Sequence, residues 1–327
     1  MFKDKKVLVT GGSGLIGRPF VDLLIERGAK VRIASLDEPF RAHPEAEFCQ
    51  VNLMQFNNCM AVCEGMDYVF HVAGIKGSPE VTFRKPASIF VPTLSFNTNM
   101  MEAAHQTGVQ WYLFTSTVGV YAPAEIFHEE DVWKTFPSHH DRFAGWAKRM
   151  GELQAEAYRI EYGWNRVSIV RPANVYGAYD NFEPPNAMVI PSLIKRALDG
   201  EDPLVVWGDG SQIRDFIHAR DVARGMLTVV EKKVTEPVNL GSGVGCSIKK
   251  IVEVIVGHMK KKPKIVWDPS KPVGDKIRLM DTTRAKSLGF QPAIPLEEGI
   301  PEVMNWYEKN RDIANKRYNV FTQEKYI

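Results

Sequence analysis

The chain has 327 residues, of which 44% are apolar and 24% charged, and its 41 basic and 39 acidic side chains leave a formal net charge of +2. This balance gives no reason to expect nucleic acid or an acidic membrane surface as a partner. No run is long and apolar enough for a transmembrane helix, and the first residues lack a signal peptide, so we expect a cytoplasmic protein without a membrane contact. The four cysteines are then expected as reduced thiols, and they show no zinc pattern, so we expect no metal site.

A glycine-rich turn follows the apolar run at residues 7–9. Glycines at positions 11, 14 and 17 lie between this expected strand and an expected helix at residues 15–27. Gly11 permits a tight turn, Gly14 lets the backbone approach a pyrophosphate, and Gly17 lets the helix pack closely on the strand. The helix N-terminus then offers free N–H groups to the phosphates. This strand–turn–helix context predicts a dinucleotide-binding α/β fold of Rossmann type.

Short apolar runs and helical segments then alternate along the chain. Strands are expected at residues 31–35, 48–53, 68–74, 111–115 and 167–170, and helices at 60–64 (a helix end), 95–106 and 142–162. Beyond residue 177, prolines interrupt this rhythm, and shorter elements are expected at residues 191–198, 204–207, 221–230, 237–240, 248–259, 264–267 and 296–309. We therefore predict a doubly wound parallel sheet in residues 1–177, rejoined by segments of 205–240, and a smaller substrate-binding domain, mainly 178–327.

The second expected strand ends where dinucleotide folds place an acid for the adenosine ribose. Ser35 stands at this position, and Asp37 follows two residues later, so Asp37 is the expected ribose contact. Neither Arg nor Lys follows Ser35 directly to receive a 2′-phosphate, although Arg41 is close. NAD is therefore the expected cofactor, and NADP stays open as the alternative.

Several motifs together resemble the extended short-chain dehydrogenase/reductases, the NAD-dependent epimerase/dehydratase group that works on nucleotide sugars. They lie at residues 10–17, 70–74, 115–117, 148, 171–177 and 207–218. The second half resembles the GDP-fucose synthase-like enzymes, through residues 180–182, 186, 189–191, 214 and 270–272. The resemblance implies an NAD(P)-dependent oxidoreductase or isomerase, of the C4 dehydrogenase, epimerase or keto-reductase type, that acts on a GDP-linked hexose or heptose.

In this family the hydride chemistry runs through a Ser or Thr, a Tyr, and a Lys four residues after the Tyr. Thr117 and Lys148 fit the first and third positions, but the Tyr position falls on Ala144. Neighbouring Phe143 has no hydroxyl and cannot replace the base. Three explanations stay open: a natural variant with another proton-transfer group, an engineered Tyr→Ala protein, or a nucleotide-sugar-binding protein without ordinary turnover. The candidate replacement groups are Tyr121, Glu129, His139, His140 and Asp141.

The resemblance also implies the residues that contact cofactor and substrate. The expected cofactor contacts are Gly11, Gly14, Leu15, Ile16, Gly17, Ser35, Asp37, Asn52, Leu53, Val72, Ala73, Gly74, Thr115, Lys148 and Pro172. The expected substrate contacts are Thr117, Asn174, Asn186, Val189, Trp207, Arg214 and Arg278. Arg214 is expected to bind the diphosphate, because a planar guanidinium suits paired phosphate oxygens.

Two further departures narrow the reaction. The Cys and His with which GDP-fucose synthases epimerise two carbons fall on Gly119 and Met188, which argues against a 3,5-epimerase. Residues 118–119 also lack the acidic pair of the family's dehydratases. The family's usual homodimer implies that the helix at 95–106 and the helix that holds Lys148 form a four-helix interface with a second copy.

Overall fold

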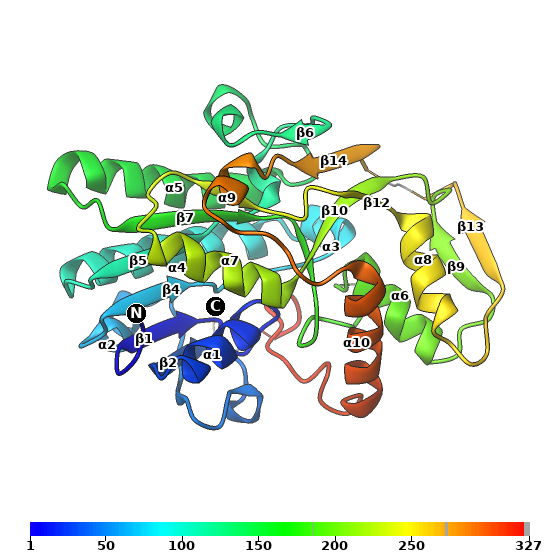
Figure 1. The fold of residues 1–327 in the computed structure, drawn as a ribbon, viewed down its shortest axis with the longest axis horizontal. Coiled ribbons are helices and arrows are strands. Elements are labelled where there is room, and N and C mark those ends of the chain that lie inside the picture. Colours follow the sequence, from blue (N-terminus) through cyan, green and yellow to red (C-terminus); the bar gives the residue numbers. More distant parts are fainter. Residues whose placement is uncertain (185, 272–273, 324–327) are drawn as a thin grey trace.

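The computed structural model describes residues 1–184, 186–271 and 274–323, and a seven-stranded parallel sheet forms its centre (Figure 1). The strand order is β11-β7-β5-β4-β1-β2-β3. These strands are β1 (Lys6–Thr10), β2 (Lys30–Ser35), β3 (Glu47–Gln50), β4 (Tyr68–His71), β5 (Trp111–Thr115), β7 (Val167–Pro172) and β11 (Val238–Leu240). The strands that follow β1 are added first on one side of it (β2, β3) and then on the other (β4, β5, β7, β11). Doubly wound sheets bind ligands at this switch point, here between β1 and β4. The predicted fold class is confirmed.

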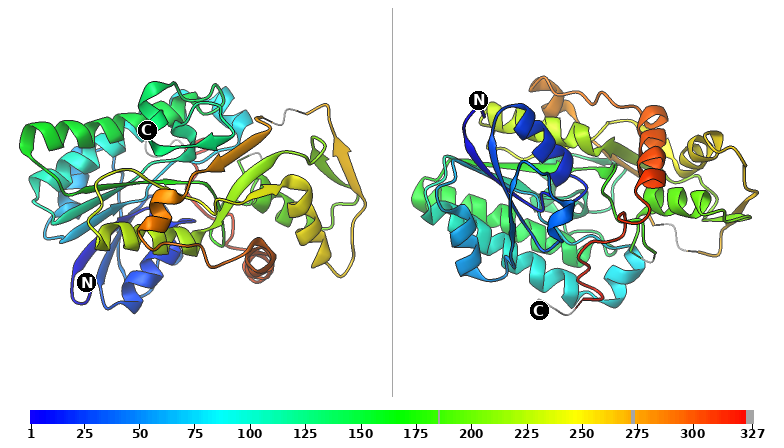
Figure 2. Two further views of the ribbon diagram at one scale, coloured as in Figure 1. Left: turned by 45° about the horizontal axis from the view of Figure 1, so that its top comes forward. Right: turned by 90° about the horizontal axis from the view of Figure 1, so that it is seen from below.

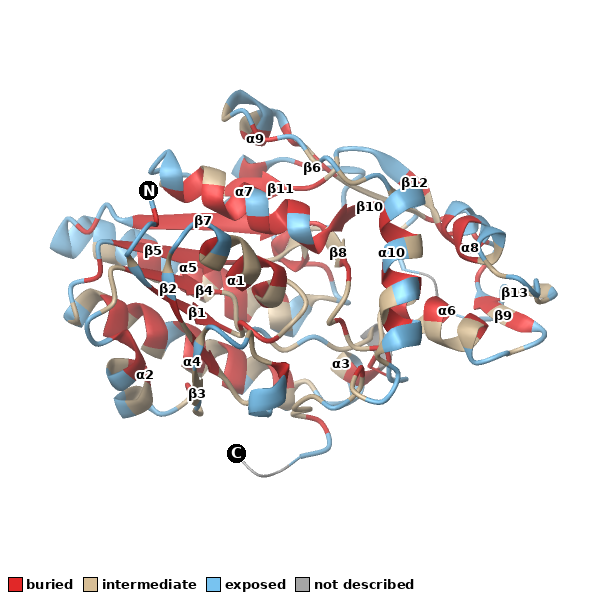
Figure 3. Ribbon diagram, turned by 60° about the horizontal axis from the view of Figure 1, so that its bottom comes forward, coloured by how far each residue is buried: buried red, intermediate tan, exposed pale blue. Residues whose placement is uncertain are grey.

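Helices cover both faces of the sheet (Figure 2). One layer contains α1 (Gly17–Glu26) and α7 (Ala219–Glu231), and the other contains α2 (Phe56–Cys63), α4 (Ala87–Gln106) and α5 (Arg142–Tyr162). Successive residues of β1 alternate between the two faces, as strand geometry requires. Val7 and Val9 join the apolar cluster under α1 and α7, whereas Leu8 joins the cluster under α2, α4 and α5. Figure 3 shows the strands buried between these layers.

The later part of the chain builds smaller sheets beside the first (Figure 1). One sheet contains β8 (Asn174–Tyr176), β10 (Ile213–His218), β12 (Gly245–Ser247), β14 (Ile277–Met280) and β6 (Ile126–Phe127), and the other pairs β9 (Leu204–Trp207) with β13 (Ile265–Asp268). The helices α6 (Val189–Leu198), α8 (Ile248–Gly257) and α10 (Leu296–Lys309) share an apolar cluster with β8, β9, β10, β12 and β13. The short helices are α3 (Pro79–Arg84) and α9 (Thr283–Ser287), with 3-10 turns η1 (Pro39–Arg41), η2 (Val118–Val120) and η3 (Glu129–Lys134).

Several expected elements differ from the observed ones. Of the segments expected to rejoin the large sheet, residues 238–240 do so as β11, whereas residues 204–207 pair with β13 outside it. The strand expected at 68–74 ends at His71, so residues 72–74 are irregular backbone at the sheet edge. Helix α4 begins at Ala87 rather than at residue 95, because Pro92 is buried within the helix instead of ending it. The division of the chain into domains at residue 177 stays a prediction.

A buried ion pair fixes α5 against the sheet. On β7, Arg171 donates from Nε to Glu152 Oε1 at 3.0 Å and from Nη2 to Oε2 at 2.6 Å. The Ser116 hydroxyl donates to the same carboxylate, so it faces the core and not the ligand crevice. Glycines then allow α5 to approach closely: a Cβ at Gly145 would lie 2.3 Å from the Gly119 oxygen. These contacts set the position of Lys148, one turn before Glu152.

Candidate functional site

The glycine turn after β1 has the geometry that a dinucleotide requires. Gly11 has φ +65°, and a Cβ there would lie 2.9 Å from Ala73 Cα. A Cβ at Gly17 would lie 2.1 Å from the Gly11 oxygen, so close packing excludes any side chain. By contrast, a Cβ at Gly14 would meet only the Gly11 oxygen, at 3.4 Å, so this side of the turn is open to an approaching phosphate. The residues present therefore fit a pyrophosphate at the start of α1.

At the expected adenosine end, Asp37 is 6% exposed and already has partners. Its Oδ2 accepts from Ser13 Oγ at 2.7 Å, and its Oδ1 accepts from the Tyr318 backbone N–H at 2.7 Å. Arg41 Nε lies 3.6 Å from Oδ2, and burial lowers the pKa of this guanidinium although Asp37 opposes the shift. The Ser35 hydroxyl lies 2.9 Å from Ser13 Oγ, to which it can donate, and it accepts from the Asp37 backbone N–H. The sequence did not indicate Ser13 or the C-terminal segment at this position.

The other expected cofactor contacts lie along the strand ends, with different exposure. The N–H groups of Val72 and Ala73 donate to Thr10 Oγ1 at 3.1 Å each. Thr115 Oγ1 is buried and has no hydrogen-bond partner within residues 1–184, 186–271 and 274–323, which suits a ligand contact. Leu53 packs into the apolar cluster under α4. Of the remaining expected contacts, Leu15, Ile16 and Asn52 are half-buried, Gly74 is exposed, and Pro172 is buried at the end of β7.

A buried network holds Lys148. Because Thr10 Oγ1 accepts two N–H bonds, its hydroxyl donates to His71 Nδ1 at 2.9 Å, and His71 Nε2 then donates to Asn97 Oδ1 at 2.9 Å. Burial lowers the pKa of His71 to about 3, so this ring is neutral. Lys148 Nζ donates to the same Asn97 oxygen at 3.4 Å. Burial lowers the pKa of Lys148 to about 7, against the opposing effect of Glu152.

His71 and Asn97 were missed as site residues. Both carry a sequence signal, since each is a polar residue on an otherwise apolar buried face, in β4 and in α4. Buried polar groups of this kind are hydrogen-bonded in native proteins. The network was therefore detectable as a polar exception, although its connection to Lys148 depends on the fold.

Ala144 lies one turn before Lys148, in apolar surroundings. It packs with Ile75 and Val320 against a cluster of three buried residues, Val81, Ile89 and Phe321. Phe143 is partly exposed and its ring lies 6.4 Å from Phe90, so it does not take the place of the missing phenol. On the neighbouring turn, Thr117 Oγ1 accepts from the Gly119 N–H at 3.2 Å.

The five candidate replacement groups are in different places. The Tyr121 hydroxyl donates to Asn239 Oδ1, and Glu129 accepts from the Asn239 N–H, so both belong to the buried network around Arg171. His139 and His140 are exposed. Asp141 lies beside the turn at residues 117–119, where a Cβ on Gly119 would lie 3.2 Å from its own Cβ.

Two arginines face each other across paired strands. Arg214 on β10 and Arg278 on β14 are register partners in a parallel pair. Arg278 Nη2 donates to Asp141 Oδ2 at 2.9 Å. Burial lowers the pKa of Arg214, and the positive charge of Arg278 lowers it further. Two adjacent guanidinium groups repel each other, and an anion bound between them offsets this repulsion. The pair therefore suits a bound anion such as a phosphate.

The remaining expected substrate contacts are less concentrated. Asn174 Nδ2 donates to the Asp215 carbonyl at 2.9 Å, whereas the buried Asn186 Oδ1 has no hydrogen-bond partner among the described residues. Val189 begins α6. Trp207 lies on the separate two-stranded sheet and is about half exposed, with Lys271 over its ring. The structure thus brings together Thr117, Ala144 and Lys148, and separately the two arginines, while Trp207 stands apart from both groups.

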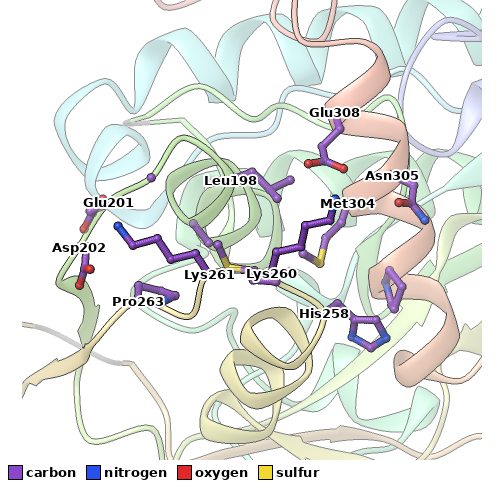
Figure 4. Close-up of a pocket in the computed structure, with 14 residues that line it drawn as sticks. Leu198, Glu201, Asp202, His258, Lys260, Lys261, Pro263, Met304, Asn305 and Glu308 are labelled. Carbon is purple, nitrogen blue, oxygen red and sulfur yellow. The ribbon is translucent and has the colours of Figure 1, made fainter.

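A cavity of about 490 Å³ opens between α6, α8 and α10 (Figure 4). Its lining includes Leu198, His258, Lys260, Met304 and Glu308. Among the described residues, those expected to contact cofactor or substrate do not line it. This cavity belongs to the second part of the chain and takes no part in the site built above.

The sequence comparisons identify the family. A profile of the NAD dependent epimerase/dehydratase family matches residues 7–241. The chain belongs to this family. Among the similar relatives of this family member, GDP-L-fucose synthase 1 of Arabidopsis thaliana is 31% identical over 320 residues, 94% of each chain. The dTDP-4-dehydro-6-deoxy-D-allose reductase of Streptomyces bikiniensis is 30% identical and aligns over 93% of this chain and 96% of its own.

A solved relative has the same architecture. The UDP-glucose 4-epimerase of Thermotoga maritima, solved with UDP-glucose, has a TM-score of 0.81 and 28% identity, over 93% of this chain and 99% of that one. The comparisons confirm the expected enzyme family and, through it, the nicotinamide cofactor. The names of the relatives agree on nucleotide sugars and differ in the base.

Residues 1–184, 186–271 and 274–323 contain neither a helix that could span a membrane nor a cluster of metal-binding side chains. The helices in these ranges do not combine the length and apolar character needed to cross a bilayer. In the same ranges, His, Cys, Asp and Glu side chains do not gather in threes where they could hold a metal ion.

Proposed function

We propose that this family member oxidises or reduces the sugar of a GDP-linked hexose or heptose, at C4, with NAD or NADP. The register pairing of Arg214 with Arg278 carries this proposal. A nucleotide sugar presents a diphosphate, and two guanidinium groups held on adjacent strands match its paired oxygens. Asn186, whose buried Oδ1 has no hydrogen-bond partner in the described part of the chain, is a further contact for the sugar nucleotide.

Thr117 and Lys148 are the proposed reaction centre. Thr117 orients the reacting sugar oxygen, and the Lys148 ammonium holds the nicotinamide ribose. The bound nicotinamide supplies the hydride chemistry. The Asn97 oxygen fixes the Lys148 amine in the crevice, since it accepts from both Nζ and the neutral His71 ring. Without a phenol at residue 144, proton transfer to or from the sugar proceeds through another group or through water, so turnover is expected to be slow.

Binding of nucleotides tests the substrate class directly. We expect GDP-mannose and GDP-fucose to raise the melting temperature more than UDP-glucose or dTDP-glucose does, because only ligands of the folded state stabilise it. Arg214→Ala should weaken GDP-sugar binding about 10- to 100-fold by calorimetry, the range for lost hydrogen bonds to charged groups. Arg311→Ala, which removes an arginine paired with Asp199 on the surface, is the matched control. Equal binding of all bases, or no effect of Arg214→Ala, would contradict the proposal.

A second function has one observation in its favour. Ala144 faces an apolar cluster where the family has a phenol, which suits a nucleotide-sugar-binding protein with little catalysis. The two functions differ in their response to Thr117→Val and Lys148→Met. An enzyme loses any turnover with these changes, whereas a binding protein has none to lose.

We propose that the chain forms a homodimer through α4 and α5. Apolar side chains are exposed on these helices, with Val91, Leu153 and Ile160 as examples. Met100 and Met101 of α4 are buried in the core and are not available for an interface. The expected surface is thus a face of the two helices that already pack on each other within one chain.

A further inference from the structure

The segment after α10 crosses the edge of the large sheet where the cofactor is expected. Figures 1 and 2 show residues 310–323, in red, running from α10 past the loops near α1 and β2 toward α3. The segment is irregular apart from turns. It begins with two anchors on the second part of the chain: Ala314 is fully buried in the cluster of α6, α8 and α10, and Asn315 Nδ2 donates to Glu183.

The next contacts close the adenosine end. Arg41 Nη1 donates to the Ile313 carbonyl at 3.1 Å and to the Lys316 carbonyl at 3.4 Å. Two residues beyond Lys316, the Tyr318 N–H donates to Asp37 Oδ1 at 2.7 Å. Asp37 is 6% exposed, although it is the acid expected to receive the ribose hydroxyls. The Tyr318 N–H occupies one acceptor position of this carboxylate and covers it, so it competes with a ribose hydroxyl for Asp37.

The last contacts lie at the other end of the crevice. Lys85 Nζ donates to the Phe321 carbonyl at 2.6 Å. The Phe321 ring is 8% exposed and packs on Val81 and Ile89, so tightly that a Cβ on Gly77 would lie 3.0 Å from it. Val320 joins the same cluster as Ala144, the position of the family's phenol.

We propose that residues 318–323 form a strap that closes the cofactor crevice and competes with the dinucleotide for Asp37. This inference rests on the cofactor part of the proposed function. The strap touches Asp37 at one end and the Ala144 cluster at the other, the two ends between which the dinucleotide is expected to lie. Among the residues that the structure describes, its attachments include one N–H on a carboxylate, one lysine on a carbonyl, and one aromatic ring in a three-residue cluster. The segment is held by neither a helix nor a strand, and irregular segments of this kind open at low free-energy cost.

Competition predicts that release of the strap tightens cofactor binding. If only the open state binds, the apparent Kd equals the intrinsic Kd divided by the open fraction. Deletion of residues from 318 onward removes the Asp37 and Phe321 contacts and keeps the anchors at 314 and 315. We expect this variant to bind NADH or NADPH about tenfold more tightly than the full chain, by nicotinamide fluorescence, with faster association.

Point variants separate the strap from a general loss of stability. Phe321→Ala and Lys85→Met each remove one attachment, and both should tighten cofactor binding in the same direction as the deletion. Lys261→Met removes an exposed lysine on the loop after α8 and serves as the matched control. Thermal unfolding of each variant checks that it remains folded.

Reciprocity gives a second readout that does not depend on the variants. Saturating NADH or NADPH should increase the rate at which a protease cuts the full chain within residues 310–323. Protection of this segment by the cofactor, or weaker binding after deletion, would overturn the proposal and make the segment a wall of the bound state. Unchanged affinity in all strap variants would overturn it as well. If neither the full chain nor the deletion binds either cofactor, the strap is not what closes the crevice, and the cofactor part of the proposed function fails separately.

Discussion

Lys148 is a buried amine without the tyrosine that the family pattern places one turn before it. In the family pattern a phenol precedes it by one turn, but here residue 144 is alanine and the amine has Asn97 as its hydrogen-bond partner. Burial favours the neutral amine and lowers the pKa of Lys148 to about 7. The folded chain therefore binds fewer protons at this residue than the unfolded chain over a wide pH range.

This pKa shift predicts how stability depends on pH. Below about pH 7 the folded state carries a buried ammonium at a cost, and between about pH 7 and 10.5 that cost disappears because only the unfolded state keeps the proton. Lys148→Met should therefore stabilise the chain more at pH 6 than at pH 9.5, by a difference on the order of 3 kcal/mol. Denaturant unfolding of both proteins at the two pH values measures this. A difference in stability that does not change with pH would contradict the shifted pKa.

Restoring the phenol tests what Ala144 has removed. We expect Ala144→Tyr to raise kcat about 100-fold, because a positioned general acid or base contributes on the order of 10²–10⁴. Ala144→Phe adds the ring without the hydroxyl and should give no gain. Equal rates for the Tyr and Phe variants would show that proton transfer does not limit this chain.

At the scale of elements, one ion pair sets the position of α5. Arg171 on β7 and Glu152 on α5 are both buried, and Ser116 at the end of β5 joins them. Since Lys148 lies one turn away on α5, this pair connects the core of the sheet to the reaction centre.

Removal of one partner should be far more costly than removal of a surface pair. We expect Arg171→Met to lower the free energy of unfolding by about 3–5 kcal/mol, because it leaves the Glu152 carboxylate buried without its counter-charge. Arg311→Ala breaks an exposed pair with Asp199 and should cost about 0–1 kcal/mol. Chemical denaturation compares the two variants. Similar losses would mean that Arg171 contributes no more than a surface arginine.

On the surface of the whole molecule, apolar side chains are exposed along α5. Leu153 is 44% exposed and Ile160 is 75% exposed. An interface made from such side chains removes them from water, which is the main driving force for stable association.

The proposed homodimer therefore depends on these residues. Ile160→Glu together with Leu153→Glu should convert the dimer to a monomer at micromolar concentration, measured by sedimentation velocity. Ile126→Glu, at an exposed apolar residue on β6, is the control and should leave the dimer intact. A wild-type monomer at the same concentration would contradict the proposal.

Most strands and helices of the fold could be predicted from local sequence patterns. Residues 111–115 and 142–162 have the expected bounds, and α5 ends at Gly163, whose φ of +63° suits glycine. The glycine turn was readable for the same reason, since its close contacts exclude side chains. The start of α4 was missed because a proline within a helix is locally indistinguishable from one that ends it.

Contacts within the site between residues far apart in the chain could not be predicted from the sequence. The pairing of Arg214 with Arg278 depends on the register of two strands far apart in the chain. The contacts of residues 313, 316 and 318 with Arg41 and Asp37 use backbone carbonyls and an N–H, which carry no residue signature. Asp37 was identified from its spacing, but the segment that covers it was not.

The proposed oxidation or reduction of a GDP-sugar is tested directly by absorbance at about 340 nm, the band of the reduced nicotinamide. The purified chain is mixed with NAD or NADP and, in turn, GDP-, UDP- and dTDP-sugars. We expect a slow rise with a GDP-hexose or GDP-heptose that disappears in the Thr117→Val and Lys148→Met variants. A flat trace with every sugar, together with no loss of NADH or NADPH absorbance when the corresponding 4-keto sugars are supplied, would contradict it.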